Sequence, residues 1–424
     1  MCLFDFSVEG LVVSSTPAPT PPDDRILGLD VLRGFALLGI LVINIWVFSM
    51  PFATLNNPTV YASAMPYGEF AGADYLVWLV GHVFAQRKFI TLFTVMFGAG
   101  IILFTRSKPS SRAIRLHYRR TVFLLLIGLA HAYLLWYGDI LVPYALCSLG
   151  VVAARDWEPR MLARIGLLLI AVPALSYIAA GVSINSAQTL ASWAPSEAAL
   201  LQEVETYRSG WVAQFDHRAP TAFTQQTSGF LGVTVWRTSG LMLCGMALFK
   251  WGVLSNERST QFYRRLLAGG GLAGLLLTGG GVWYKEAVDW AAPEALFFGT
   301  QFNYWGSLFL AGAYIGGIML FCRRFGGGIV TTALSAVGRT AFSNYLLQTL
   351  IATTIFYGHG LGLFGSVSRV EQFGFVVAIW TVQIVLSVVW LRYFQFGPME
   401  WVWRTVTYGE RQPLRKEPAD ATAE

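Results

Sequence analysis

The chain consists of long apolar runs separated by short polar gaps. Runs of about 17–25 mostly apolar residues, long enough to cross the hydrocarbon core of a bilayer as helices, recur along most of its 424 residues. This pattern predicts an all-α fold, a polytopic transmembrane helical bundle with about ten membrane helices. The stretch 75–88 either belongs to the second crossing or lies along the membrane surface. The predicted helices cover, in chain order, about residues 25–50, 89–104, 118–137, 140–154, 161–182, 230–249, 266–284, 296–321, 338–357 and 373–394.

The polar gaps differ in charge, and this difference predicts how the chain is oriented. Most of the 30 Lys and Arg residues fall in every second gap, whereas the gaps between them hold Arg208, Arg218, Lys285 and Arg369. Cytoplasmic segments of membrane proteins are enriched in Lys and Arg, so this split predicts that both termini are cytoplasmic. The chain then divides into a disordered cytoplasmic segment (1–24), membrane helices 1–5 (25–182), an extracytoplasmic loop (183–222), membrane helices 6–10 (223–404) and a basic cytoplasmic tail (405–424).

Composition supports a membrane protein and argues against two other classes. Hydrophobic residues make up 55% of the chain and charged residues 13%, whereas soluble proteins carry about a quarter charged residues. The net charge of +6 does not indicate a nucleic-acid partner, because the basic residues lie in the gaps between apolar runs. The four cysteines are scattered without metal-ligand spacing, so we expect no metal site and no disulfide framework. Membrane lipids are the expected partners, and the sequence leaves the oligomeric state open.

The first predicted helix carries three polar residues on one face. Asp30, Arg33 and Asn44 fall within about 60° of one another when each residue turns the helix by 100°. Asp30 and Arg33 are one turn apart and can form an ion pair. Because a polar stripe facing lipid is costly, we expect this face to line the interior of the bundle. The plainer alternative is an ion pair at the cytoplasmic edge and an asparagine that only packs.

The stretch from Tyr118 to Tyr144 holds the strongest candidate for chemistry. It is apolar around a single histidine, His131, and it breaks at Gly138 and Asp139 before a second apolar run. A histidine inside a membrane helix is costly unless it has a partner or a role. The break predicts two antiparallel helices joined by a tight turn, with His131 about 10 Å below it and both side chains near one mouth of the bundle. The alternative is a histidine bonded to a backbone carbonyl and an aspartate that only caps the next helix.

Further polar residues lie inside predicted helices. Arg237 falls within 230–249 and needs a partner if it is buried. Thr340, Asn344 and Gln348 are spaced i, i+4 and i+8, which predicts a second polar stripe. These residues and Asp30 are candidates for a substrate path.

Several segments of the chain resemble one known family. LDVLRGFALLGILVINI, KFITLFTVMFGAG, GLAHAYLLWYGDIL, NYLLQTL and LRYFQFGPMEWVWR resemble, in order, motifs of the YeiB-like bacterial inner-membrane family, which is named for a domain of unknown function. The resemblance covers about residues 25–404 and implies a multi-pass protein of the bacterial inner membrane. The D-x-L-R-G pattern at Asp30 to Gly34, with Asn44, also resembles the transmembrane acyltransferase superfamily, which includes heparan-alpha-glucosaminide N-acetyltransferase. That resemblance implies transfer of an acyl group from cytoplasmic acyl-CoA to an acceptor across the membrane.

The chain departs from the acetyltransferase pattern at one place. In that enzyme a histidine soon after the asparagine accepts the proton or the acyl group, whereas residues 45–81 contain no histidine here. By position, His131 is the best replacement.

Two functional hypotheses follow. In an acyltransferase, His131 is the general base, Asp139 orients it and Asn44 completes the catalytic candidates. Arg33, Arg119 and Arg120 are then the candidates for binding the phosphates of acyl-CoA, which acts as a donor substrate and not as a permanently bound cofactor; the acceptor is unknown. In the alternative, a transporter or flippase, Asp30, Arg237, Asn344 and Gln348 line the path of a small polar or amphiphilic solute.

Overall fold

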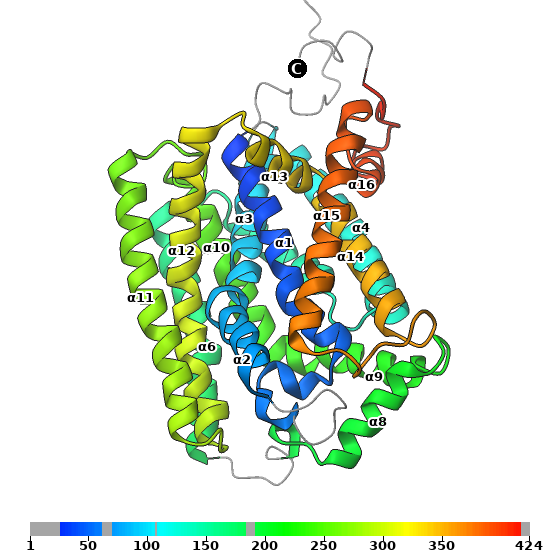
Figure 1. Ribbon diagram of the computed structural model, residues 1–424. Coiled ribbons are helices and arrows are strands. Elements are labelled where there is room, and N and C mark those ends of the chain that lie inside the picture. Colours follow the sequence, from blue (N-terminus) through cyan, green and yellow to red (C-terminus); the bar gives the residue numbers. More distant parts are fainter. Residues whose placement is uncertain (1–25, 62–69, 107, 184–190, 417–424) are drawn as a thin grey trace, which may run out of the picture.

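The computed structural model describes residues 26–61, 70–106, 108–183 and 191–416, and this part of the chain is helical without β-strands (Figure 1). Short helical segments of two kinds join the α-helices. The 3-10 segments are η2 (Phe52–Leu55), η3 (Pro58–Tyr61) and η5 (Val152–Ala154), and the π-helical segments are η4 (Gly81–Ala85), η6 (Phe230–Thr234) and η7 (Glu294–Gly299). The α-helices are α1 (Leu27–Ser49), α2 (Gly72–Val80), α3 (Lys88–Thr105), α4 (Ser110–Leu134), α5 (Leu141–Val151), α6 (Pro159–Ser183), α8 (Glu197–Arg208), α9 (Phe215–Gln226), α10 (Val235–Lys250), α11 (Thr260–Ala287), α12 (Thr300–Phe325), α13 (Ile329–Arg339), α14 (Ala341–Phe356), α15 (Arg369–Tyr393) and α16 (Pro398–Tyr408).

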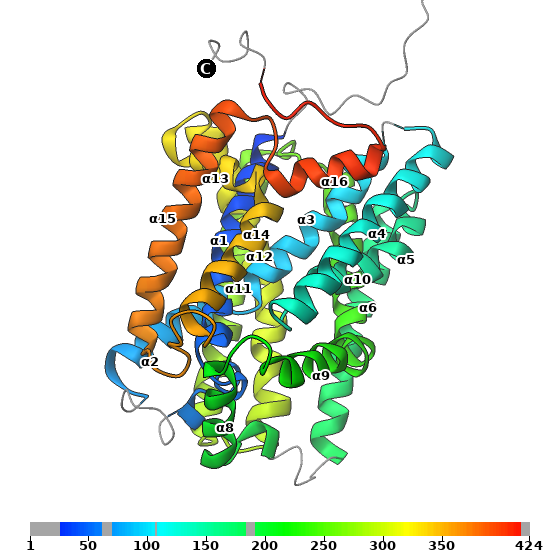
Figure 2. The same ribbon diagram turned by 90° about the vertical axis from the view of Figure 1, so that its right-hand side faces the viewer.

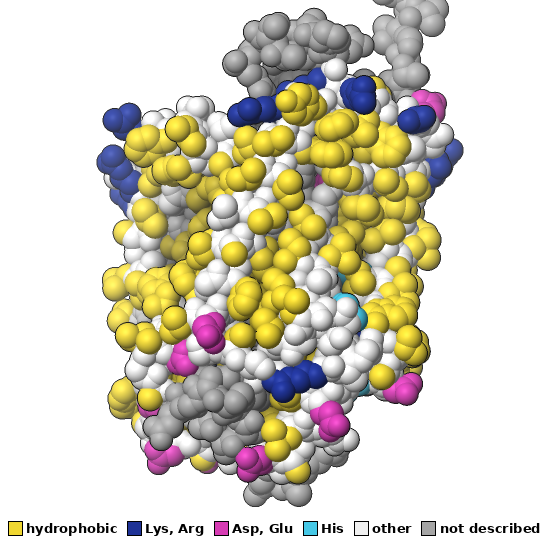
Figure 3. All heavy atoms as spheres, turned by 45° about the vertical axis from the view of Figure 1, so that its right-hand side comes forward, with side chains coloured by type: hydrophobic (Ala, Val, Ile, Leu, Met, Phe, Trp, Pro, Cys, Tyr) yellow, Lys and Arg dark blue, Asp and Glu magenta, His cyan; other side chains and the backbone are white. Residues whose placement is uncertain are grey.

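The helices form a bundle with an apolar outer surface. Within the described residues, seven helices or helix pairs are long and apolar enough to cross a membrane: α1, α2 with α3, α6, α9 with α10, α11, η7 with α12, and α15. Large apolar side chains point outward from them, as on α11, where Leu276 is 67% and Trp283 72% exposed. Hydrophobic side chains cover most of the middle of the face in Figure 3. The predicted all-α, polytopic membrane bundle is therefore confirmed, while ten crossings stay a prediction.

The ends of the bundle differ in charge. In Figures 1 and 2, the start of α1 lies at the same end as α13 and α16, and α8 and α9 lie at the opposite end. On the face in Figure 3, most Lys and Arg side chains gather at the first end and most Asp and Glu side chains at the second. This arrangement agrees with the predicted topology, in which the end with α16 is cytoplasmic. The predicted disordered segment 1–24 lies outside the described residues, as do residues 184–190 of the predicted loop and 417–424 of the predicted tail.

Helix α1 lies in the centre of the bundle because its sequence is apolar on nearly every side. It contacts α3, α12, α13, α14 and α15, and most of its side chains are buried. At its crossing with α13, a Cβ on Gly34 would lie 1.9 Å from the carbonyl oxygen of Leu334, and a Cβ on Gly338 would lie 1.9 Å from that of Asp30. The glycine of the D-x-L-R-G pattern is therefore required by this contact between two backbones.

Glycines also set the contact between α11 and α12. The small-xxx-small spacing of Gly270 with Gly274 and of Gly312 with Gly316 predicts close helix packing. A Cβ on Gly270 would lie 2.7 Å from the carbonyl oxygen of Phe309, and one on Gly316 would lie 2.8 Å from that of Tyr263. The prediction of close packing is confirmed.

Residues 72–105 form one discontinuous helix. Helix α2 packs against α15, the π-turn η4 follows, and the chain breaks at Arg87, whose backbone φ is +71°, before α3 begins at Lys88. The sequence left open whether 75–88 crosses the membrane, and the structure joins it to α3 in one apolar run of 34 residues.

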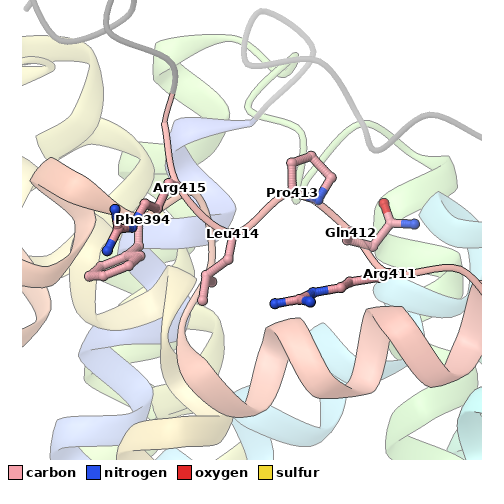
Figure 4. Close-up of a pocket in the computed structure, with 6 residues that line it drawn as sticks. All are labelled: Phe394, Arg411, Gln412, Pro413, Leu414 and Arg415. Carbon is pink, nitrogen blue, oxygen red and sulfur yellow. The ribbon is translucent and has the colours of Figure 1, made fainter.

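The C-terminal part folds back onto the bundle instead of hanging free. Half-buried Glu400 at the start of α16 accepts hydrogen bonds from the backbone N–H groups of Phe342 (2.7 Å) and Ser343 (3.2 Å), so its carboxylate caps α14. The segment after α16 returns to the end of α15, where the N–H of Gln395 donates to the carbonyl of Leu414 over 2.9 Å. A hollow of about 570 Å³ lies here, lined by Phe394 and residues 411–415 (Figure 4).

Helix α8 docks on the bundle through the half-buried carboxylate of Glu203. The N–H of Phe52 donates to Oε1 of Glu203 over 3.0 Å, and burial raises the pKa of Glu203 from its ordinary 4.5 to about 7. Since this pKa is raised in the folded chain, the folded chain keeps the proton to a higher pH than the unfolded chain does. The stabilising effect is complete below pH 4.5 and is lost as the pH rises through about 7.

We therefore expect α8 to detach more readily at pH 8 than at pH 5.5. Hydrogen–deuterium exchange of residues 197–208 should be faster at pH 8 after correction for the intrinsic exchange rate, and Glu203→Gln should remove the difference. Glu205→Gln is the matched control, because Glu205 is exposed on the same helix. An equal loss of pH dependence in Glu205→Gln would contradict the assignment.

Candidate functional site

The candidate site lies where α4 ends and the chain turns into α5. Helix α4 stops at Leu134, and the N–H groups of Leu135 and Trp136 both donate to the carbonyl of His131 over 2.9 Å. The chain therefore folds back three residues earlier than the sequence predicts. Asp139 returns to the level of His131 instead of lying about 10 Å beyond it.

The turn is covered by protein, which corrects its predicted position at an outer mouth. Helix α5 has 11 residues, about 16 Å of rise, and this is about half of a hydrocarbon core. Above the turn, the Trp211 indole donates to the carbonyl of Leu134 over 2.7 Å and the Arg218 guanidinium to that of Tyr133 over 2.8 Å. Helix α9 and the segment before it thus close the site from the end of the bundle that carries α8 (Figure 2).

His131 connects two helices that are far apart in the sequence. Its Nδ1 lies 2.8 Å from Oδ1 of Asp139, and its Nε2 lies 2.9 Å from the hydroxyl oxygen of Thr349 on α14. The side chains of His131 and Asp139 are each 1% exposed. The predicted pairing of the two residues is confirmed.

Asp139 is held by further donors. Its Oδ2 accepts from the N–H of Val142 over 2.7 Å, so it also caps α5, as the sequence suggests. The Tyr345 hydroxyl bonds to Asp139 and accepts from the N–H of Ile140 over 3.1 Å. Asp139 therefore has two roles at once: Oδ2 caps α5, and Oδ1 forms the hydrogen bond with the imidazole of His131.

These contacts fix the orientation of the imidazole. A carboxylate accepts hydrogen bonds, so we assign the ring proton to Nδ1 and leave Nε2 as the acceptor for the Thr349 hydroxyl. A hydroxyl, an imidazole and a carboxylate in this order form the arrangement in which a base activates a nucleophile. The geometry can therefore move a proton from a hydroxyl at the Thr349 position to His131.

Sequence reasoning missed Thr349 and Tyr345. Both belong to α14, four residues apart, and both lie in or beside the NYLLQTL segment. The stripe chosen from the sequence, Asn344 and Gln348, lies on another face of the same helix. The signal for the correct face was the pair of hydroxyls at Tyr345 and Thr349.

Asn344 and Gln348 take part in a buried network between α14 and α15. The Gln348 amide donates to Oε1 of Gln383 over 2.9 Å, and the Asn344 amide donates to the hydroxyl of Ser387 over 2.8 Å. Both residues are at most 4% exposed. These bonds account for the two side chains as interhelical contacts, and their role in a substrate path stays a prediction.

The other residues predicted on α1 are not among the hydrogen-bond partners of His131 in the described part of the chain. Arg33 donates to Asp30 over 3.1 Å, which confirms the predicted ion pair, and both side chains are partly buried. Asn44 is half-buried, and it is not among the hydrogen-bond partners that the described residues give His131. A catalytic role for Asn44 stays a prediction.

The predicted phosphate-binding arginines divide into two groups. Arg120 lies between the rings of Phe104 (4.6 Å) and Trp403 (4.3 Å), close enough to Arg33 for the two charges to interact. Arg119 is exposed on α4. The structure thus brings Arg33 and Arg120 together at the end of the bundle that carries α16.

A second buried histidine on α4 provides a comparison. His117 is 1% exposed, and its Nε2 lies 3.2 Å from the carbonyl oxygen of Ser148 and 3.4 Å from the hydroxyl of Thr121. One ring nitrogen thus bonds to a backbone carbonyl, as is common for buried structural histidines, while Nδ1 is buried and has no partner among the described residues. His131 differs because its two nitrogens meet a carboxylate and a hydroxyl.

Comparison with known proteins gives matches along nearly the whole chain. Residues 248–410 match the family described as "Protein of unknown function (DUF418)". The chain is 34% identical over 393 residues to the uncharacterized protein YeiB of Escherichia coli K12, covering 91% of this chain and 96% of YeiB. It is 30% identical over 416 residues to the uncharacterized protein YxaH of Bacillus subtilis 168, covering 95% and 99%. These names describe no activity, so the similarity bears on the family and not on a reaction.

Proposed function

The chain belongs to the YeiB-like family of DUF418 membrane proteins, and we propose that it is a membrane-bound acyltransferase with His131 as its general base. The observation that carries this proposal is the connection from the Thr349 hydroxyl through His131 to Asp139, over 2.9 and 2.8 Å. The similarity of the first helix to transmembrane acyltransferases supports the same reaction class, and membership of the YeiB-like family supports a location in the bacterial inner membrane.

The reaction needs a proton acceptor beside the attacking hydroxyl. In the proposed step, His131 Nε2 takes the proton while the hydroxyl oxygen attacks the carbonyl carbon of the thioester. The C–S bond then breaks, and the imidazolium returns the proton to the departing CoA thiolate. Asp139 holds the ring in position and stabilises its positive charge during the transfer.

Thr349 marks where the attacking hydroxyl must lie. Either its own oxygen receives the acyl group first, or an acceptor hydroxyl replaces it beside Nε2. Thr349→Val removes the hydroxyl and keeps the shape, so it separates the two routes. Loss of transfer indicates an acyl-threonine intermediate, which mass spectrometry of the peptide containing Thr349 would detect.

The donor would enter from the cytoplasmic side. Arg33 and Arg120 lie there, and guanidinium groups suit the phosphates of CoA. Arg120 precedes His131 by 11 positions on α4, or about 16 Å along the axis. In this proposal an extended pantetheine arm spans that distance and brings the thioester to His131.

Labelled acetyl-CoA tests the proposal against the alternative, a transporter or flippase. The buried Arg237 is the observation that favours transport, since intramembrane charges often line solute paths. Purified protein in vesicles is supplied with acetyl-CoA labelled in the acetyl group. Label on the protein or on a membrane acceptor supports acyl transfer, whereas label that crosses the membrane unmodified supports transport.

A further inference from the structure

A group of three buried cations and one partly buried cation, Arg87, surrounds the break in the discontinuous helix. Arg87 and Lys88 lie at the start of α3, Arg237 in the first turn of α10 and Lys285 in the last turn of α11. We call these four residues the outer cation cluster. Lys88 is fully buried, Lys285 is 3% exposed and Arg237 is 8% exposed. From the sequence, Lys285 is expected in an outer loop, and Arg87 and Lys88 interrupt an apolar run. Only the fold brings these residues close together.

The four charges repel one another and have no carboxylate partner. Lys88 interacts electrostatically with Arg87, Arg237 and Lys285, and Arg237 interacts with Arg87. The ion pairs found in the described part of the chain, Arg33 with Asp30, His131 with Asp139 and Arg155 with Asp156, include none of them. Buried charges without a counter-charge are strongly unfavourable, so an anion bound among these four residues would be strongly stabilised.

The contacts of the cluster leave donors free. Lys88 Nζ donates to the carbonyl of His82 (2.7 Å) and to Oδ1 of Asn303 (2.5 Å), which leaves its third proton. One Arg237 nitrogen, Nη2, bonds to the hydroxyls of Thr91 (3.2 Å) and Ser307 (2.9 Å).

One buried nitrogen of the cluster has no hydrogen-bond acceptor in the described part of the chain. Nη1 of Arg237 is buried and has no partner among the described residues. The Lys285 ammonium lies over the ring of Trp290, 5.2 Å from the ring centroid. Arg237 and Lys285 are both polar side chains more than nine-tenths buried.

The backbone adds donors at the same place. The first N–H groups of α3 have no intrahelical acceptor, and no side chain caps this helix. The N-terminus of a helix favours an anion, as in the broken helices that bind solutes in transporters. The π-helical segments η6 and η7 directly precede α10 and α12, and two residues separate η4 from α3; the three α-helices lie beside one another in Figure 1. Such segments occur frequently at functional sites.

We propose that the outer cation cluster binds a phosphate group, presented by a lipid headgroup or by a phosphorylated solute. A phosphate offers up to two negative charges and several acceptor oxygens, which suit two guanidinium and two ammonium groups better than a single carboxylate does. The cluster lies near the extracytoplasmic side. Lys88 is the first residue of α3, and the other end of this helix, toward the cytoplasmic side, is about 25 Å away along the axis. The site is independent of His131.

Binding is tested on the full chain, delipidated in an uncharged maltoside detergent. One arm compares sodium phosphate with sodium chloride at equal ionic strength, and the other compares phosphatidylglycerol with monoolein, which has no phosphate. We expect the thermal midpoint to rise with phosphate or with phosphatidylglycerol. A rise with free phosphate indicates a soluble ligand, and a rise with phosphatidylglycerol alone indicates a lipid headgroup.

Variants connect the effect to the cluster. Lys285→Gln and Arg87→Gln should each weaken binding about tenfold, the effect of one charge-assisted hydrogen bond. These two are preferred over Arg237→Gln, because Arg237 joins α10 to α3 and α12 through its hydroxyl contacts. Arg264→Gln is the control, since Arg264 is exposed at the other end of α11. No rise with either ligand, or equal weakening in Arg264→Gln, would overturn the proposal.

Discussion

Replacing His131 by alanine is expected to lower acyl transfer about a thousandfold and to leave insertion in the membrane near normal. The alanine removes the group that takes the proton, and general bases contribute about 10²–10⁴ in rate. Asp139→Asn should have a comparable effect, because an amide at this position no longer fixes the ring proton on Nδ1 over the 2.8 Å contact. Transfer of label from acetyl-CoA by purified variants is the measurement.

Folding must be measured in the same variants. Asp139 also caps α5 through Val142, so Asp139→Asn keeps one oxygen for that bond and Asp139→Ala does not. Normal thermal midpoints with lost transfer assign the effect to chemistry. Full transfer in His131→Ala would remove this residue from the mechanism.

The largest expected effect on stability comes from one added methyl group. Helices α3 and α10 touch backbone to backbone, because a Cβ on Gly98 would lie 2.0 Å from the carbonyl oxygen of Met242. The reciprocal contact is equally close, with a Cβ on Gly245 at 1.9 Å from the carbonyl oxygen of Val95. Backbone atoms cannot turn away as a side chain does, so Gly98→Ala must separate the two helices. We expect destabilisation by about 3 kcal/mol or more.

Gly100 is the matched control for this substitution. It lies on the same helix two residues later, and a Cβ there would meet no atom within 4 Å. Gly100→Ala should be neutral or stabilising by up to about 1 kcal/mol, since alanine favours the helix. Thermal unfolding of the solubilised variants measures both. Equal midpoints for the two variants would contradict the close packing of α3 and α10.

The apolar runs were sufficient to predict the class of fold. Length and hydrophobicity identify membrane helices because the bilayer imposes both. The same signal predicted a helix at 140–154, close to α5 and η5, but it could not show that the turn before this helix lies inside the protein. The position of the turn depends on α9 and the segment before it, which cover the turn with contacts from Arg218 and Trp211.

The candidate site was predictable only as far as it is local. His131 and Asp139 are eight residues apart across a visible turn, so the sequence indicates their pairing. Thr349 is 218 residues from His131, and no periodicity of α14 shows which face turns toward α4. The outer cation cluster is also non-local, because its members come from three helices and meet only in the folded chain.

The most direct test of the proposed function compares two histidines on one helix. Glutamine at either position keeps a hydrogen-bonding side chain but cannot take a proton at neutral pH. In the labelled acetyl-CoA assay, His117→Gln should transfer at nearly the wild-type rate, because His117 bonds to the carbonyl of Ser148. His131→Gln should lose transfer with an unchanged thermal midpoint. Full activity in His131→Gln would contradict the account, since its hydrogen bonds to Asp139 and Thr349 would then be structural alone.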